Sequence, residues 1–82
     1  MQNYPNPFNP QTTIIFRLPE NKHVTLTIYD ITGREVTTLV DGYQYAGEHS
    51  VIWSAVNMPT GVYFYRLVAG SYTTVRRMLL VK

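Results

Sequence analysis

The sequence predicts a small all-β domain, because three observations favour strands over helices. The chain has 82 residues, 45% hydrophobic and 13% aromatic, and Val, Ile, Thr and Tyr outnumber the good helix formers. Apolar and polar residues alternate over short segments without a helical period. Turn-forming residues recur about every 8 to 12 positions, which is typical of two packed antiparallel sheets. We therefore expect an immunoglobulin-like β-sandwich of six to seven short strands, with a small barrel as the alternative.

A proline-rich segment opens the chain and is expected to form neither a helix nor a central strand. Its prolines are Pro5, Pro7 and Pro10. Proline fixes φ and has no amide to donate, and it drives the preceding residue toward extended geometry. Residues 1–10 are therefore predicted to be a stiff strap, and residues 11–82 the folded domain. The strap's aromatic residues, Tyr4 and Phe8, are its expected anchors, either to the domain or to another copy of the chain.

Two alternating segments follow the strap and predict the first two strands of the domain. Residues 12–18 place apolar side chains on one face and end at a turn-forming Pro-Glu-Asn cluster. Residues 23–30 alternate most regularly, with aliphatic residues on one face and threonine or tyrosine on the other. The predicted core residues of these strands are Ile14, Phe16, Val24, Leu26 and Ile28.

Residues 34–40 are predicted to return as the second arm of a hairpin. The connection, residues 31–33, is tight, and Gly33 can adopt the positive φ that such a turn requires. Asp41, followed by glycine, is expected to end the strand. A seventh strand is expected either from residues 42–47 or from the strap.

Residues 48–55 are predicted to be the next strand, with Val51 and Trp53 facing the core and Trp53 as its central aromatic residue. Residues 58–61 place proline second and glycine fourth, as in a type I turn.

Residues 62–69 form a tyrosine-rich strand whose buried face is ambiguous, because both alternating sets are apolar. We expect Tyr63 and Tyr65 to face the core. A two-residue loop, Gly then Ser, suits a type II′ turn and leads into the last strand, residues 72–81. The adjacent basic residues Arg76 and Arg77 would discourage sheet addition if this strand lies at an edge.

Several classes of function are disfavoured by composition and motif. Seven Lys and Arg against five Asp and Glu give a net charge of only +2, too small and scattered for a nucleic-acid surface. Without cysteine, the chain has no disulfide, thiolate zinc site or cysteine nucleophile. No apolar run approaches the roughly 20 residues of a membrane helix, so stable membrane insertion is not expected.

The chain is also expected not to be an enzyme and to hold no metal or cofactor. His23 and His49 are far apart in sequence and lack a third ligand nearby, which favours ordinary surface histidines. Asp30 and Asp41 flank the predicted hairpin, where aspartate commonly accepts hydrogen bonds from turn amides. The glycines are scattered singly, without a phosphate-binding cluster.

Several segments, in a fixed order, carry a resemblance to a known family. They are Asn3–Ile14 with its Tyr-Pro-Asn-Pro-Phe-Asn-Pro string, Leu18-Pro19, Val24–Asp30 with Gly33–Val36, the Gly-x-His-x-Val-x-Trp stretch of residues 47–53, and Gly61–Leu67. Together they resemble the C-terminal sorting domain of the type IX secretion system, most closely its type A form. That family is related to the immunoglobulin-like domain of the flagellar hook-cap protein.

The resemblance implies a non-enzymatic address label on proteins exported by Bacteroidetes-like bacteria. Such a protein crosses the periplasm, is recognised by an outer-membrane translocon and reaches the cell surface. A sortase-like peptidase then cuts upstream of the domain. The positions that match the family's recognised motifs are Pro5, Asn6, Pro7, Gly33, Gly61, Tyr63, Arg77 and Lys82.

A second function of another class stays open from the residues alone. The chain would then be a structural assembly module that builds an oligomer or extracellular filament by strand addition. Its docking element would be either the strap or an unpaired edge strand.

Overall fold

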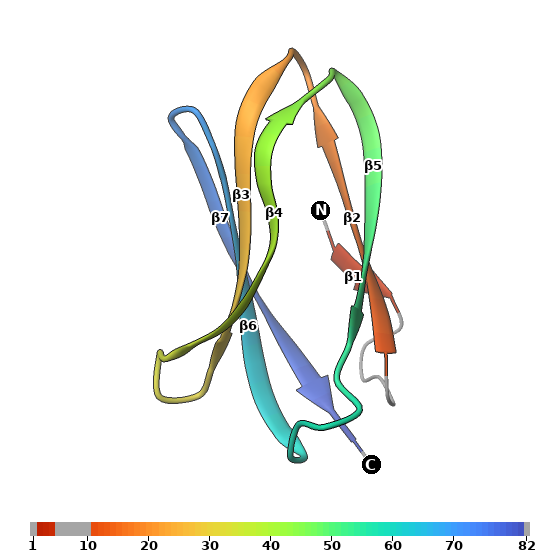
Figure 1. The fold of residues 1–82 in the computed structure, drawn as a ribbon, viewed down its shortest axis with the longest axis vertical. Helices are drawn as coiled ribbons and strands as arrows, with labels where there is room; N and C mark the ends of the chain where they lie inside the picture. Colours follow the sequence, from red (N-terminus) through yellow and green to blue (C-terminus); the bar gives the residue numbers. More distant parts are fainter. Residues whose placement is uncertain (1, 5–10, 82) are drawn as a thin grey trace.

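The computed structural model describes residues 2–4 and 11–81, which form seven strands and no helix. The strands are β1 (Gln2–Tyr4), β2 (Gln11–Leu18), β3 (Lys22–Asp30), β4 (Glu35–Gln44), β5 (Gly47–Ser54), β6 (Gly61–Ala69) and β7 (Tyr72–Leu80). They form two antiparallel sheets, of order β1-β2-β5 and β4-β3-β6-β7, which face each other as two layers (Figure 1). The prediction of a small immunoglobulin-like β-sandwich is therefore confirmed.

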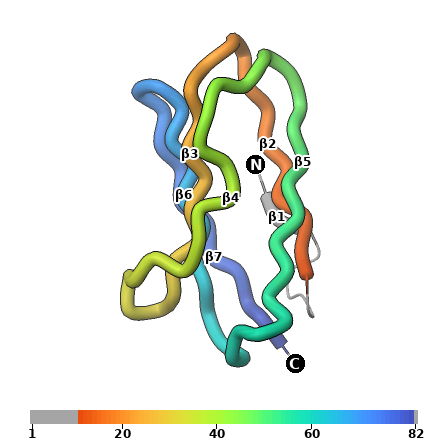
Figure 2. The backbone as a smooth tube through the Cα atoms, viewed as in Figure 1, coloured from red at the N-terminus to blue at the C-terminus, as the bar shows by residue number. Residues whose placement is uncertain are grey.

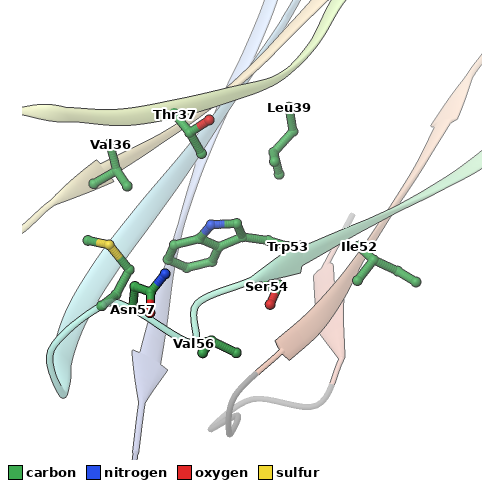
Figure 3. A pocket seen from close by; sticks show the side chains of 9 residues that line it. Val36, Thr37, Leu39, Ile52, Trp53, Ser54, Val56 and Asn57 are labelled. Carbon is green, nitrogen blue, oxygen red and sulfur yellow. The ribbon is translucent and has the colours of Figure 1, made fainter.

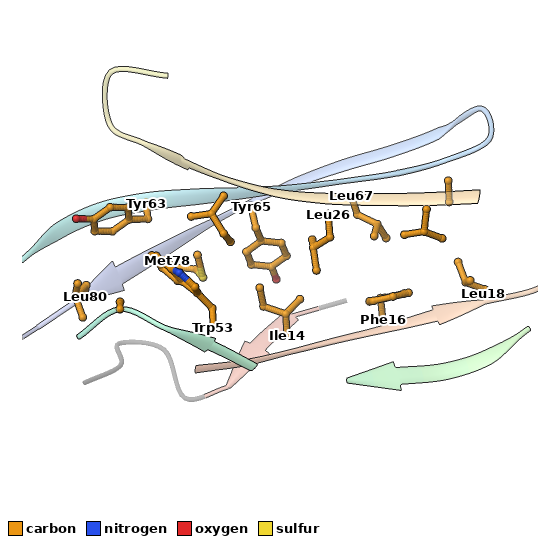
Figure 4. Packing of buried hydrophobic residues seen from close by; sticks show 14 residues of the cluster. Ile14, Phe16, Leu18, Leu26, Trp53, Tyr63, Tyr65, Leu67, Met78 and Leu80 are labelled. Carbon is orange, nitrogen blue, oxygen red and sulfur yellow. The ribbon is translucent and has the colours of Figure 1, made fainter. Parts of the chain in front are cut away.

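The core lies between the two sheets, where the inward side chains of both meet (Figure 4). The buried residues include Ile14, Phe16, Val24, Leu26, Ile28, Trp53, Tyr63 and Tyr65, together with Met78 and Leu80 from β7. Val51 differs from the expectation, because it is only half-buried. The reason is its position on β5, an edge strand beside the open side of the sandwich.

The tyrosines of β6 point into the core, and the residues that alternate with them lie on the outer face. Tyr65 is fully buried and Tyr63 is 3% exposed, whereas Val62 and Phe64 are half-buried. The ring of Tyr63 meets Trp53 edge-on, with 5.4 Å between ring centroids. This arrangement suits aromatic pairs and bridges the two sheets.

β4 is longer than predicted, because β3 begins at Lys22 and pairs with it as far as Gln44. Asp41 therefore lies inside a strand, and the expectation that it ends the strand and bonds to turn amides is wrong. Its carboxylate lies 3.1 Å from the Nε2 atom of His23 on β3. Register shifts interrupt the β3–β4 ladder at two places.

The seventh strand comes from the beginning of the chain and not from residues 42–47. β1 pairs with β2, with Tyr4 opposite Thr13. The side chains of β1 and the whole of residues 5–10 lie outside the described residues. The division of the chain at residue 10 into strap and domain stays a prediction.

The β6–β7 hairpin has the two-residue loop that the sequence predicts. Ala69 pairs with Tyr72, and Gly70 between them has a φ of 62°. Ser71 does not have a positive φ, which is the pattern of a type II′ turn. A Cβ atom at Gly70 would lie 3.3 Å from the side chain of Lys22, so this position also has little space.

Two connections between the sheets are tied together at one end of the sandwich, drawn at the top of Figure 1. The amide of Ala46, between β4 and β5, donates a 2.8 Å hydrogen bond to the Oδ1 atom of Asn21, between β2 and β3. His49 stacks on Phe16 with 5.1 Å between ring centroids, and its Nε2 atom lies 2.6 Å from the carbonyl oxygen of Tyr45. These contacts hold the connection between β4 and β5 in place (Figure 2).

Candidate recognition surface

The opposite end of the sandwich brings together three parts of the chain that are far apart in sequence. They are the β3–β4 turn, the β5–β6 connection and the end of β7 (Figure 1). The sheet register sets this arrangement, because Asp30 pairs with Tyr63 and Gly61 pairs with Leu80. We refer to this end, with residues 30–34 and 55–61, as the turn end.

Asp30 organises the β3–β4 turn. Its Oδ1 atom accepts hydrogen bonds from the Thr32 hydroxyl at 2.6 Å, the Thr32 amide at 2.9 Å and the Arg34 amide at 3.0 Å. The Gly33 amide donates to the Asp30 carbonyl at 3.0 Å, and Gly33 has a φ of 87°. The Thr32 hydroxyl and the Arg34 amide hold the pKa of Asp30 below its usual 3.8. The turn is therefore fixed while its outer side chains remain exposed.

Those outer side chains are Ile31, which is 65% exposed, and Arg34, whose side chain is 80% exposed. The Arg34 Nε atom lies 3.7 Å from the second carboxylate oxygen of Asp30. A rigid turn thus presents one aliphatic and one cationic group at the surface.

Tyr63 holds the neighbouring β5–β6 connection. Its hydroxyl donates a 2.6 Å hydrogen bond to the carbonyl oxygen of Pro59. Burial and, secondly, the charge of Asp30 raise the pKa of this phenol. The hydrogen-bonded turn in the connection joins the Met58 amide to the Ala55 carbonyl at 3.0 Å, so it precedes the predicted turn at residues 58–61.

The predicted recognition residues fall in three places. Gly33 and Gly61 lie at the turn end, and Tyr63 lies next to it on β6, opposite Asp30. Arg77 is an exposed residue of β7, opposite Phe64. Outside the described residues lie Pro5, Asn6, Pro7, Phe8 and Lys82, and the side chain of Tyr4. The recognition role of all of these residues stays a prediction.

An open groove that sequence reasoning missed lies along the side of the sandwich where β4 and β5 form the rims of the two sheets (Figure 3). Its volume is about 430 Å³. It is lined by Val36, Thr37, Leu39, Ile52, Trp53, Ser54, Val56, Asn57 and Met58. One feature of the sequence could have indicated the groove: Ile52 is an aliphatic residue on the face of β5 that otherwise carries Ser50 and Ser54.

Of the four candidate catalytic and metal-binding residues, His23 and Asp41 come together at 3.1 Å, whereas His49 and Asp30 contact other groups. Among residues 2–4 and 11–81, no group of three His, Asp or Glu side chains is placed to hold a metal ion. Nor do these residues include a helix with the length and apolar character needed to cross a membrane. The best-defined features of the described surface are the hydrogen-bonded turns and the apolar groove. Such features suit recognition of another macromolecule.

Comparison with known proteins gives one clear match. No curated protein matches the chain. The family described as the secretion system C-terminal sorting domain matches residues 2–82, almost the full length of the chain. The match includes both sheets and the turn end. The chain therefore belongs to the secretion system C-terminal sorting domain family.

Proposed function

We propose that this chain is a non-enzymatic address domain that directs a cargo protein across the outer membrane to the cell surface by the type IX secretion system. The observation that carries the proposal is the family match over residues 2–82. The fold supports it, because a small sandwich with fixed, projecting turns is a suitable surface for a receptor. The cargo passes through the periplasm and ends at the cell surface or outside the cell.

The proposed partners are the outer-membrane translocon and a sortase-like peptidase. The translocon reads the turn end, where Asp30 holds the β3–β4 turn and Tyr63 holds the β5–β6 connection. Because these turns are fixed before binding, little conformational entropy is lost when a receptor contacts them. The peptidase acts upstream of the strap.

Export of a reporter protein tests the proposal. A signal peptide, a folded reporter and this chain are fused in that order and expressed in a host that has the system. The reporter is expected at the cell surface, and the same reporter without this chain is expected in the periplasm. Periplasmic retention of a fusion whose sorting domain is folded contradicts the proposal.

Two arginines provide a test variant and a matched control for the predicted recognition role of Arg77. Arg77 and Arg66 are both exposed and lie on neighbouring strands of the same sheet, but only Arg77 is a predicted recognition residue. Arg77→Glu is expected to reduce the surface reporter, and Arg66→Glu is expected to leave it unchanged. Equal loss in both variants would indicate a general effect of charge in place of a specific contact.

A further inference from the structure

β2 is paired along its whole length on one side but along only part of it on the other. On one side β5 pairs with every residue of β2 from Gln11 to Leu18. On the other side β1 pairs with residues 13–15 only. Within the described part of the chain, no strand pairs with residues 16–18 on that second side. This stretch of β2 is therefore an open edge that begins where β1 stops.

A pocket of about 310 Å³ adjoins the open edge, at the end of the sandwich away from the turn end. Its apolar lining includes Phe16 and Leu18 from β2 and Leu67 and Ala69 from β6. Phe16 and Leu18 point from their sheet towards Leu67 on the other (Figure 4). Tyr72, at the start of β7, completes this lining and is 57% exposed. Edge and pocket are thus parts of one opening in the side of the sandwich.

The direction of β1 leads the chain that precedes it onto this opening. β1 runs antiparallel to β2, with Gln2 opposite Ile15. If the ladder continues, the three positions upstream of Gln2 fall opposite residues 16–18. Directly opposed residues share a face of the sheet. The positions opposite Phe16 and Leu18 would therefore face the pocket, and the position opposite Arg17 would face the solvent.

We propose that the chain immediately upstream of Gln2 continues β1 along residues 16–18 of β2 and closes the pocket with apolar side chains. This inference rests on the proposed function, in which a cargo protein is joined ahead of the domain. The occupant is therefore the linker between cargo and domain. Pairing satisfies open backbone groups of β2, and the inward side chains remove the exposed ring of Tyr72 from water.

The linker has an advantage over any free strand that could pair with this edge. It is covalently joined to β1, which already lies in register on β2. Its effective concentration at the edge is therefore far higher than that of a separate partner, and no association step is needed. A strand from another molecule would have to compete with this tethered segment.

The charges around the opening predict which linker side chains are tolerated. The side chain of Arg17 is 74% exposed on the outer face, where it forms a 3.4 Å ion pair with Glu48. A carboxylate at the position opposite Arg17 would stay in water beside a cation. A carboxylate at the position opposite Leu18 would instead be buried among apolar side chains, which is unfavourable. The linker is therefore expected to accept a charge at the outward position and to reject one at the inward position.

Hydrogen exchange of a purified fusion tests the proposal without depending on export. A folded reporter is joined ahead of the chain, with threonine at the second position upstream of Gln2 and valine at the third. NMR then follows the amides of residues 16–18 in the fusion and in the chain alone. The slowest of these amides is expected to exchange about tenfold or more slowly in the fusion, an effect the size of one or two backbone hydrogen bonds. Amides of the β6–β7 loop are the internal control and are expected to be unchanged.

Two linker variants move one charge between the two faces. Aspartate in place of the valine, opposite Leu18, is expected to abolish the protection. Aspartate in place of the threonine, opposite Arg17, is expected to preserve it. Both changes lie outside the folded domain, so neither depends on whether a core variant folds. Nuclear Overhauser contacts between the valine methyl groups and the ring of Tyr72 are expected to locate the linker in the pocket.

Three results would overturn the proposal. They are equal exchange in the fusion and the chain alone, equal effects of the two aspartate variants, and protection that increases with protein concentration, which would indicate a second copy at the edge. A fusion that is exported although its linker shows no protection would overturn this inference and leave the proposed function intact.

Discussion

The hydroxyl group of Tyr65 is fully buried and has no hydrogen-bond partner among the described residues. Burial raises the pKa of this phenol to about 12, and the charge of Arg76 opposes the shift. The hydroxyl of Tyr63, two residues away on the same strand, donates to Pro59. Two tyrosines of the same face therefore differ in what their hydroxyl groups contribute to stability.

Tyr65→Phe is expected to stabilise the chain by about 1 kcal/mol, because it removes a buried hydroxyl group without a partner. Tyr63→Phe is the matched control and is expected to destabilise it by about 1 kcal/mol, because it removes a hydrogen bond. Urea unfolding of the three proteins measures both differences. A loss of stability in Tyr65→Phe would show that its hydroxyl group is hydrogen-bonded in solution.

Asp30→Asn is expected to reduce the dependence of stability on acid pH. The pKa of Asp30 is lowered in the folded state, so the stability that its charge provides is present above pH 3.8 and is lost as the pH falls through the lowered pKa. The difference in urea midpoint between the parent and the variant should therefore narrow below pH 3.8. A difference that stays constant through the acid range would contradict this account.

Single residues were predictable from sequence where their partners are local. Asp30 was expected to accept hydrogen bonds from turn amides, and its partners Thr32 and Arg34 lie within four residues of it. Asp41 is also an aspartate near a glycine, as Asp30 is, but its carboxylate contacts His23 on the neighbouring strand. This contact depends on where β3 begins, and the sequence around Asp41 does not show where that is.

At the scale of the elements, the β6–β7 hairpin depends on a glycine. Gly70→Ala is expected to cost about 1 kcal/mol, because a side chain is unfavourable at a φ of 62° and its Cβ would press on the Lys22 side chain. Gly42→Ala is the control: its φ is not positive and no atom lies within 4 Å of an added Cβ. Thermal unfolding should show a clear loss for the first variant and little change for the second.

Alternation predicted the strands well, because one face of each inner strand is buried. In β3, the predicted Val24, Leu26 and Ile28 are all fully buried. The pattern was less informative in β4, where the register shifts break the alternation. The groove was beyond prediction for a related reason. Which strands border it depends on the sheet that each strand joins, and local pattern does not determine sheet membership.

For the whole molecule, the core is thin and Trp53 supplies much of it. Trp53→Ala is expected to cost about 3 to 5 kcal/mol, a large part of the 5 to 15 kcal/mol typical of a folded domain. Ile52→Ala, which removes a 60% exposed side chain from the adjacent position, is expected to change stability by less than about 1 kcal/mol. Thermal melts separate the two. A Trp53→Ala protein that melts within a few degrees of the parent would contradict the central place of this residue in the core.

The pairing of β2 with β5 affects the rate at which the molecule folds. The β3–β4 hairpin lies between these two strands in the sequence, so the three-stranded sheet closes only after a long loop has been formed. During synthesis, Ile14 and Phe16 leave the ribosome well before β5 is available to complete their sheet. Slow folding, with apolar surface exposed in the interval, is therefore built into the order of the strands. A chaperone that binds this surface would keep the nascent chain from aggregating until β5 arrives.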